Sequence, residues 1–170
     1  MDRTLLLMRH ANADWPPGLT NDIDRPLSAR GNKDAAKIGC WIKENNLVPS
    51  CIRSSYATRA FQTTTNVCQQ LNIEKERIVQ DERIYNTTRD QLLSIVQETD
   101  NTIIRLLIVG HNPTFSDTLK LLCQRTPQEN VEYSMPTACL AVISFKCFWH
   151  EVGKDSGQLN VLVSPGNFPQ

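Results

Sequence analysis

The sequence predicts an α/β fold, namely a three-layer α/β/α sandwich around a mainly parallel central sheet. Short apolar runs of strand length, such as those at 5–8 and 105–109, alternate with longer segments whose apolar residues recur at helical spacing. Strands that alternate with helices are typical of parallel sheets built from βαβ units. No linker rich in proline, glycine or serine divides the 170 residues. We therefore expect a single domain over residues 1–170.

The first half of the chain begins with a strand at 5–8, whose unbroken apolar run indicates burial on both faces. Ser28 is a residue type favoured at helix N-caps, so we expect the first helix to follow it and to stop near 45–46. A second strand is expected within 48–54, and a second helix over 58–71.

The second half repeats this alternation. The apolar run at 105–109 is the second strong strand, and it ends in Gly110-His111-Asn112. The other expected elements are a short strand at 78–79, helices at 89–98 and 114–123, and strands at 138–145 and 158–163.

Composition narrows the class of partner. The 18 basic and 18 acidic residues cancel, so no positive excess favours nucleic acid. The apolar runs are far shorter than a membrane span, and Met1 to Thr4 leads directly into the first strand, which leaves no room for a signal peptide. We expect a cytoplasmic protein without membrane or nucleic-acid partners.

The six cysteines include no C-x-x-C pair, which makes a structural zinc site an unattractive interpretation. In a chain without an expected secretory signal, we predict that most of them are reduced and act as small apolar residues.

Basic side chains follow the two strong strands at the point where each ends. Arg9 and His10 follow the first, and His111 follows the second. Ligands of open α/β sheets bind at the carboxyl ends of the strands, so both histidines should face one crevice. Arg59 lies in the first turn of the next predicted helix, whose free N–H groups also attract anions. This set of groups predicts a phosphate site.

A neutral imidazole in such a site is a competent nucleophile toward phosphorus. We expect His10 to attack in line, to form a phosphohistidine, and to be released by water. Arg9, Arg59 and His111 would then stabilise the charge on the transferred phosphoryl group.

Four motifs occur in order: RHA at 9–11, DRPLSARG at 24–31, RSSYATRAFQT at 53–63 and VGHNP at 109–113. Together they resemble the histidine phosphatase superfamily with its phosphoglycerate-mutase-like fold. The first two resemble its SixA-type phosphohistidine phosphatase branch. The resemblance implies that His10 is the phosphorylated nucleophile, that Arg9, Arg59 and His111 bind phosphate, and that no cofactor or metal is required.

Larger members of this family carry a glutamate that acts as general acid after the second helix. Here the corresponding stretch is QDERIYNTTRDQ, in which Glu82 and Asp81 are candidates without a surrounding signature. An N–P bond to imidazole is labile and needs a weaker acid than an ester. The missing signature therefore favours phosphohistidine as the substrate.

The 51 residues between Arg59 and His111 leave no room for a capping insertion. An open crevice suits a protein surface that bears phosphohistidine, such as a histidine phosphotransfer protein, although small phosphorylated metabolites remain an alternative.

Two further residues have open roles. Asn12 is a candidate for lining the phosphate pocket, because it follows the first motif. Arg25 either contacts substrate or belongs only to the helix entry. We expect Asp24 to be structural, paired with Arg25 or Arg30 at the surface.

Two other function classes are alternatives. Metal-assisted hydrolysis could use His10, His111 and a carboxylate such as Asp14 or Asp24, but no metal-binding spacing supports it. A module that binds phosphate or a partner without catalysis is the second.

Overall fold

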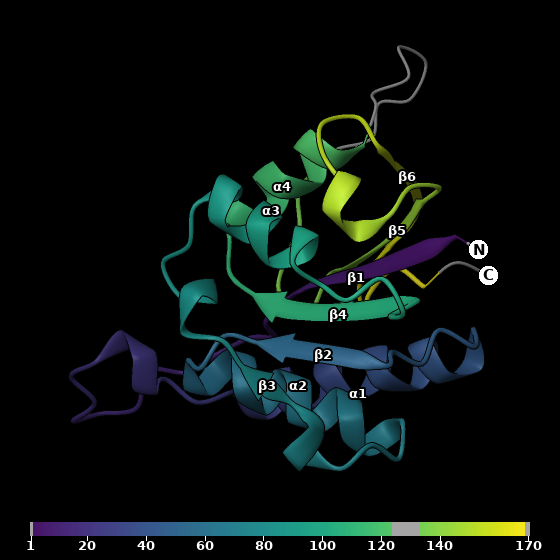
Figure 1. Ribbon diagram of the computed structural model, residues 1–170. Coiled ribbons are helices and arrows are strands. Elements are labelled where there is room, and N and C mark those ends of the chain that lie inside the picture. The colour runs from purple at the N-terminus through teal and green to yellow at the C-terminus, as the bar shows by residue number, and fades with distance from the viewer. Residues whose placement is uncertain (1, 124–132, 169–170) are drawn as a thin grey trace.

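A computed structural model describes residues 2–123 and 133–168 (Figure 1). The chain alternates strands with helices in its first two thirds and ends in two strands. In chain order the strands and α-helices are β1 Arg3–Arg9, α1 Ala29–Glu44, β2 Cys51–Ser54, α2 Thr58–Gln70, β3 Val79–Gln80, α3 Arg89–Gln97, β4 Arg105–Gly110, α4 Thr114–Leu122, β5 Leu140–Phe145 and β6 Gly157–Val163. Short 3₁₀ turns are η1 Asp22–Asp24, η2 Lys75–Arg77, η3 Glu82–Ile84 and η4 Trp149–Glu151.

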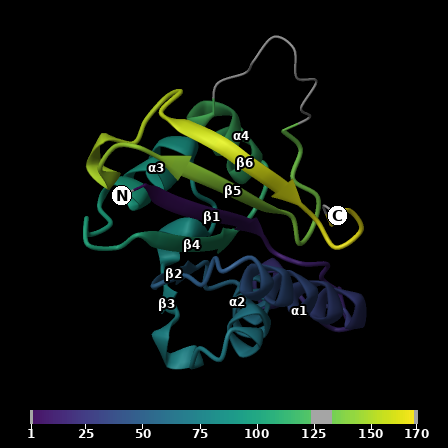
Figure 2. The same ribbon diagram turned by 90° about the vertical axis from the view of Figure 1, so that its right-hand side faces the viewer.

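The strands form one six-stranded sheet in the order β3-β2-β4-β1-β5-β6. The pairs β1–β4, β2–β4 and β2–β3 are parallel, whereas β5 runs antiparallel to both β1 and β6. The predicted α/β fold with a mainly parallel sheet is confirmed. Figure 2 shows the sheet with β5 and β6 beyond β1 and with β4, β2 and β3 on the other side.

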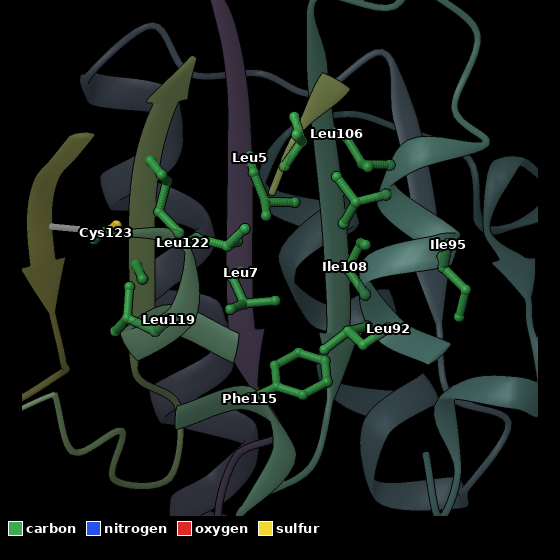
Figure 3. Packing of buried hydrophobic residues seen from close by; sticks show 14 of the residues in the cluster. Leu5, Leu7, Leu92, Ile95, Leu106, Ile108, Phe115, Leu119, Leu122 and Cys123 are labelled. Atoms are coloured by element: carbon green, nitrogen blue, oxygen red, sulfur yellow. The ribbon is translucent and has the colours of Figure 1, made fainter. Parts of the chain in front are cut away.

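Helices cover both faces of the sheet. Side chains from α3 and α4 pack with Leu5 and Leu7 of β1 on one face, and side chains from α1 and α2 pack with Leu6 and Met8 on the other. Successive residues of a strand point to opposite faces, so the continuous apolar run of β1 fills both cores. The residues labelled in Figure 3 belong to the first core: Leu5, Leu7, Leu92, Ile95, Leu106, Ile108, Phe115, Leu119, Leu122 and Cys123.

The start of α1 is built as the sequence predicts. The Ser28 side chain accepts a hydrogen bond from the N–H of Gly31 at 2.9 Å, which caps the helix. A side chain at Gly31 would overlap the carbonyl oxygen of Asn12, so only glycine lets the loop after β1 lie this close. The loop that follows β1 is therefore held against the start of α1.

Element ends differ from the prediction by a few residues. The strand expected within 48–54 begins at Cys51, and β5 begins at Leu140 rather than at Ala138. Ala138 has a φ of 60°, in a turn that leads into the strand, and this left-handed backbone is incompatible with a strand.

All six cysteines are free, and Cys68, Cys123 and Cys139 are buried. Cys68, Cys123 and Cys139 pack in the apolar cores as small apolar residues, as expected, whereas Cys40 is exposed. Within the two described ranges, no helix is both long and apolar enough to cross a membrane.

Candidate active site

Three parallel strands end at the same level of the sheet. Arg9 of β1 pairs with Gly110 of β4, and the N–H of His10 donates to the Gly110 carbonyl at 2.9 Å. Ser55, the first residue after β2, donates from its N–H to the carbonyl of Val109 at 2.9 Å. The parallel register thus brings the residues after β1, β2 and β4 to one edge, as the sequence predicts.

His10 is held in one orientation by two contacts. Its Nδ1 lies 2.8 Å from the carbonyl oxygen of Ala11, which can only accept, so Nδ1 carries the proton. Its Nε2 then has a free lone pair, and Nε of Arg59 donates to it at 3.3 Å. Burial, together with the positive charges of Arg59, Arg9 and Arg25, lowers the pKa of His10 to about 4, although the Ala11 hydrogen bond acts in the opposite direction. The imidazole is therefore neutral at neutral pH.

His111 lies beside it, with the two ring centroids 5.1 Å apart. Its Nε2 shares a hydrogen bond of 2.8 Å with Oγ of Ser55. Its Nδ1 is buried and has no hydrogen-bond partner among the described residues, which leaves a polar atom for a bound oxyanion to contact. Burial, followed by the nearby His10 and Arg59, lowers the pKa of His111 to about 3.

The two arginines reach the site from different elements. Arg9 ends β1 and donates from Nη1 to the carbonyl of Met135 at 3.0 Å, while its buried Nε has no partner within the described part of the chain. Arg59 lies in the first turn of α2, which no side chain caps, so that helix N-terminus remains available to an anion. Arg9, His10, Arg59 and His111 form a cluster of basic groups, here called the basic cluster.

Asp22, which the sequence analysis did not single out, contacts this cluster. Its Oδ2 accepts from Nη2 of Arg59 at 2.9 Å and from the Tyr85 hydroxyl at 3.1 Å, while its carbonyl accepts from Nη1 of Arg59 at 2.7 Å. Its Oδ1 pairs with Nη1 of Arg25 at 3.4 Å. Burial acts to raise its pKa, but the hydrogen bond and charge of Arg59 outweigh it, so the net pKa lies below its usual value. In the sequence, the signal for this residue was its spacing from Arg25, which lies three positions after Asp22.

The expected pairing of Asp24 is wrong. Arg25 pairs with Asp22 and Arg30 pairs with Asp34, while Asp24 accepts a hydrogen bond from Asn21. The physical reason is the η1 turn, which brings residues three apart in the sequence together.

Asn12 and Arg25 both have structural contacts. The side-chain oxygen of Asn12 accepts from Oγ of Ser28 at 2.8 Å, so it is engaged at the start of α1. Arg25 donates to the carbonyls of Asp14 and Ala13, and its guanidinium lies 4.9 Å from the centroid of the Trp15 ring. Roles in substrate binding remain predictions for these two residues.

The two candidate acids lie in different environments. Asp81 is buried, accepts from Arg53 at 3.1 Å and from Nη2 of Arg83 at 2.7 Å, and its pKa is lowered chiefly by the Arg83 hydrogen bonds. A carboxylate held in this way is a poor proton donor. Glu82 is exposed at the start of η3 and remains a candidate. Across residues 2–123 and 133–168, no group of three or more His, Cys, Asp or Glu side chains is placed to hold a metal ion.

Comparison with known proteins gives the same family that the motifs resemble. The family model of the histidine phosphatase superfamily (branch 1) matches residues 5–88, which include His10 and Arg59. An uncharacterized protein of Mycobacterium tuberculosis is 29% identical over 150 residues, covering 85% of this chain and 91% of the relative. An uncharacterized chloroplastic protein of Arabidopsis thaliana is 28% identical over 97% of this chain and 79% of its own.

Solved structures that carry the name phosphohistidine phosphatase SixA are similar over nearly the whole chain. The structure from Nakamurella multipartitia has a TM-score of 0.84 and 26% identity, and it covers 97% of both chains. The structure from Agrobacterium tumefaciens has a TM-score of 0.78 and 28% identity, and it covers 96% of this chain and 99% of its own. This likeness extends beyond residues 5–88, which the family model matches.

Proposed function

Since the chain belongs to the histidine phosphatase superfamily and is a phosphatase, we propose that it removes phosphate from phosphohistidine in proteins through a phosphorylated His10. The observation that carries the proposal is the His10 tautomer. Nδ1 is committed to the Ala11 carbonyl, which leaves the Nε2 lone pair beside Arg59, at the centre of the basic cluster.

In the first step, phosphate oxygens replace the present contacts of the basic cluster. Arg9 and Arg59 donate N–H groups to these oxygens, and His111 donates to another from Nδ1 while its Nε2 accepts from the Ser55 hydroxyl. The Nε2 lone pair of His10 forms a bond to phosphorus as the bond to the leaving group breaks. The proton stays on Nδ1, which donates to the Ala11 carbonyl throughout, so the ring becomes a phosphorylated imidazolium.

In the second step, water attacks phosphorus from the side that the leaving group has vacated. The N–P bond breaks, its electron pair returns to Nε2, and phosphate leaves with the oxygen of water. His10 is neutral again, and the reaction requires no cofactor.

Two observations support phosphohistidine as the substrate. The similar structures named above carry the name of a phosphohistidine phosphatase. In addition, the 51 residues between Arg59 and His111 are taken up by the rest of α2, by η2, β3, η3, α3 and β4 and by their connecting loops, and no larger insertion lies among them to cover the crevice. An open crevice admits a phosphohistidine on the surface of a histidine phosphotransfer protein.

The test compares wild type with His10→Ala on a protein that bears phosphohistidine and on an aryl phosphate, both with a chelator present. We expect phosphohistidine to be lost faster, and we expect both reactions to require His10. Turnover of the aryl phosphate alone would transfer the substrate assignment to small phosphate esters. Turnover by His10→Ala at the wild-type rate would overturn the proposed nucleophile.

A further inference from the structure

We infer that Asp22 makes this site selective for phosphohistidine over phosphate esters by binding the departing imidazole through its protonated distal nitrogen. The inference rests on the proposed function, because it assumes attack by His10, and it adds the residue that sets the leaving-group preference.

The position of Asp22 is defined by Arg59. One guanidinium donates from Nε to the attacking nitrogen of His10 at 3.3 Å and from Nη2 to Oδ2 of Asp22 at 2.9 Å. The carboxylate is thus separated from the nucleophile by the length of a guanidinium group. Because the guanidinium itself fills the line between them, we place the phosphoryl group on Nε2 beside Arg59, with its leaving group toward the exposed side of Asp22.

The carboxylate is also open to a ligand. The Asp22 side chain is 42% exposed, whereas the Arg59 side chain that it contacts is 8% exposed. The inner side of Asp22 is held by Arg59 and by the Tyr85 hydroxyl, and Arg25 contacts its other oxygen. A carboxylate oxygen accepts more than one hydrogen bond, so Asp22 can accept another from the crevice.

The charge of Asp22 does not suit an ordinary phosphate ester. The basic cluster attracts a phosphate dianion, but a carboxylate at its edge repels that dianion and also repels the negative charge that develops on a departing alkoxide or phenoxide. The Asp22 carboxylate therefore opposes the cleavage of esters at the position where the leaving group departs. The same charge favours a substrate whose leaving group is a cation while it is still bound to phosphorus.

Phosphohistidine supplies such a leaving group. When its distal nitrogen is protonated, the ring is a cation, and the electron pair of the breaking N–P bond returns to the ring as the new bond to Nε2 of His10 forms. The imidazole then departs as a neutral molecule that keeps its distal proton. A carboxylate that accepts a hydrogen bond from the distal N–H stabilises this protonated form, and the hydrogen bond persists through the transition state.

The aromatic residues beside Asp22 fit a flat cationic ring. Tyr85, whose hydroxyl donates to Asp22, lies edge-to-face with His111, with ring centroids 5.6 Å apart. Tyr56 packs on Tyr85 at 5.5 Å and is 39% exposed. Tyrosine faces attract cations, so these two rings offer a surface for an imidazolium.

Asp22 could instead serve only to position Arg59, and the test separates the two roles. Asp22→Asn keeps the size of the side chain and the backbone carbonyl that accepts from Arg59, but removes the charge. Asp24→Asn, in the same η1 turn, is the matched control, because Asp24 contacts Asn21. Values of kcat/KM are measured for free phosphohistidine, which needs no protein docking, and for an aryl phosphate.

We expect Asp22→Asn to lower kcat/KM for phosphohistidine at least about tenfold, since a hydrogen bond to a charged group is lost, while kcat/KM for the aryl phosphate is unchanged or higher. Asp24→Asn should leave both values at wild type. Aryl phosphate turnover also shows that the variant is folded. Equal losses on the two substrates would assign Asp22 to Arg59 positioning alone and overturn the inference, as would no loss on either.

The His10→Ala comparison keeps this outcome distinct from failure of the proposed function. If both reactions require His10 but Asp22→Asn does not change their ratio, the nucleophile stands and the inference about Asp22 fails. If neither reaction requires His10, the proposed function itself fails.

Discussion

Arg59 donates from Nε to Nε2 of His10 at 3.3 Å, so the lone pair assigned to the attack on phosphorus is held by a cation. This contact orients the ring and keeps it neutral, because a protonated Nε2 would face the guanidinium with its own hydrogen. A bound phosphate must take over the guanidinium before His10 can react. In the free site, the nucleophilic nitrogen of His10 and the guanidinium of Arg59 are therefore hydrogen-bonded to each other.

Arg59→Ala should lose transition-state stabilisation of about 3 kcal/mol, comparable to the loss of one oxyanion donor. The change removes donors to the transferred phosphoryl group and leaves Asp22 without its partner. Steady-state kcat/KM on either substrate measures the loss. Arg30→Ala is the control, since the Arg30 side chain is 82% exposed and pairs with Asp34 on α1. An Arg59→Ala enzyme with nearly normal kcat/KM would remove Arg59 from the phosphate site.

The pH dependence should show a neutral nucleophile. With a His10 pKa of about 4, the reactive form persists from neutral pH down to about pH 5 and is lost as the pH falls through 4. We expect kcat/KM for the aryl phosphate, measured as initial rates, to show no loss near pH 6.5, where an ordinary histidine becomes protonated. A fall with a midpoint near 6.5 would contradict the assigned environment of His10.

The same shifts affect stability. His10 and His111 have folded pKa values of about 4 and about 3, whereas in the unfolded chain they bind protons near pH 6.5. Between these values the unfolded state binds more protons, so the free energy of unfolding should fall as the pH is lowered from 6.5 toward 4. Denaturant titrations measure this slope, and His111→Gln should make it shallower. An unchanged slope in that variant would argue against the buried, neutral state of His111.

Much of the fold was predictable because the strongest strands are continuous apolar runs. The runs at β1 and β4 indicate burial on both faces, and the parallel register then brings His10 and His111 together. The antiparallel direction of β5 and β6 was not predictable, because an apolar run carries no information on the direction of its neighbours.

Asp22 was missed for a different reason. Its importance comes from contacts with Arg59, Arg25 and Tyr85, which lie in three separate parts of the chain. Such convergence depends on tertiary structure, whereas the choice between Asp22 and Asp24 as the partner of Arg25 depends on the η1 turn. The motif around 24–31 marks the region but does not identify the acidic residue that faces the site.

Asp81 should prove structural. Its carboxylate accepts from Arg53, from the Arg83 side chain and from the Arg83 N–H that it caps at η3. Asp81→Ala removes these hydrogen bonds, although Arg53 and Arg83 both keep Glu98 as a partner, and should lower the free energy of unfolding by about 1 kcal/mol, measured by denaturant titration. Its kcat/KM on the aryl phosphate should stay near wild type. A large kcat loss with unchanged stability would instead identify Asp81 as the proton donor.

Chelation should have no effect on turnover. In the proposed mechanism the phosphate charge is neutralised by guanidinium and imidazole groups, so no divalent cation has a task in either step. Dialysis against a chelator followed by assay with and without added Mg²⁺, Mn²⁺ or Zn²⁺ measures this. Activity that disappears on chelation and returns with one metal would support the metal-assisted alternative.

The central claim is that Nε2 of His10 carries the phosphoryl group. It is tested most directly by mixing the enzyme rapidly with substrate, quenching under alkaline conditions that preserve N–P bonds, and locating the phosphate by mass spectrometry and ³¹P NMR. We predict a phosphoenzyme modified at His10 on Nε2, because Nδ1 is held by the Ala11 carbonyl. Phosphate on another residue, or turnover with direct transfer to water and no phosphoenzyme, would contradict the account.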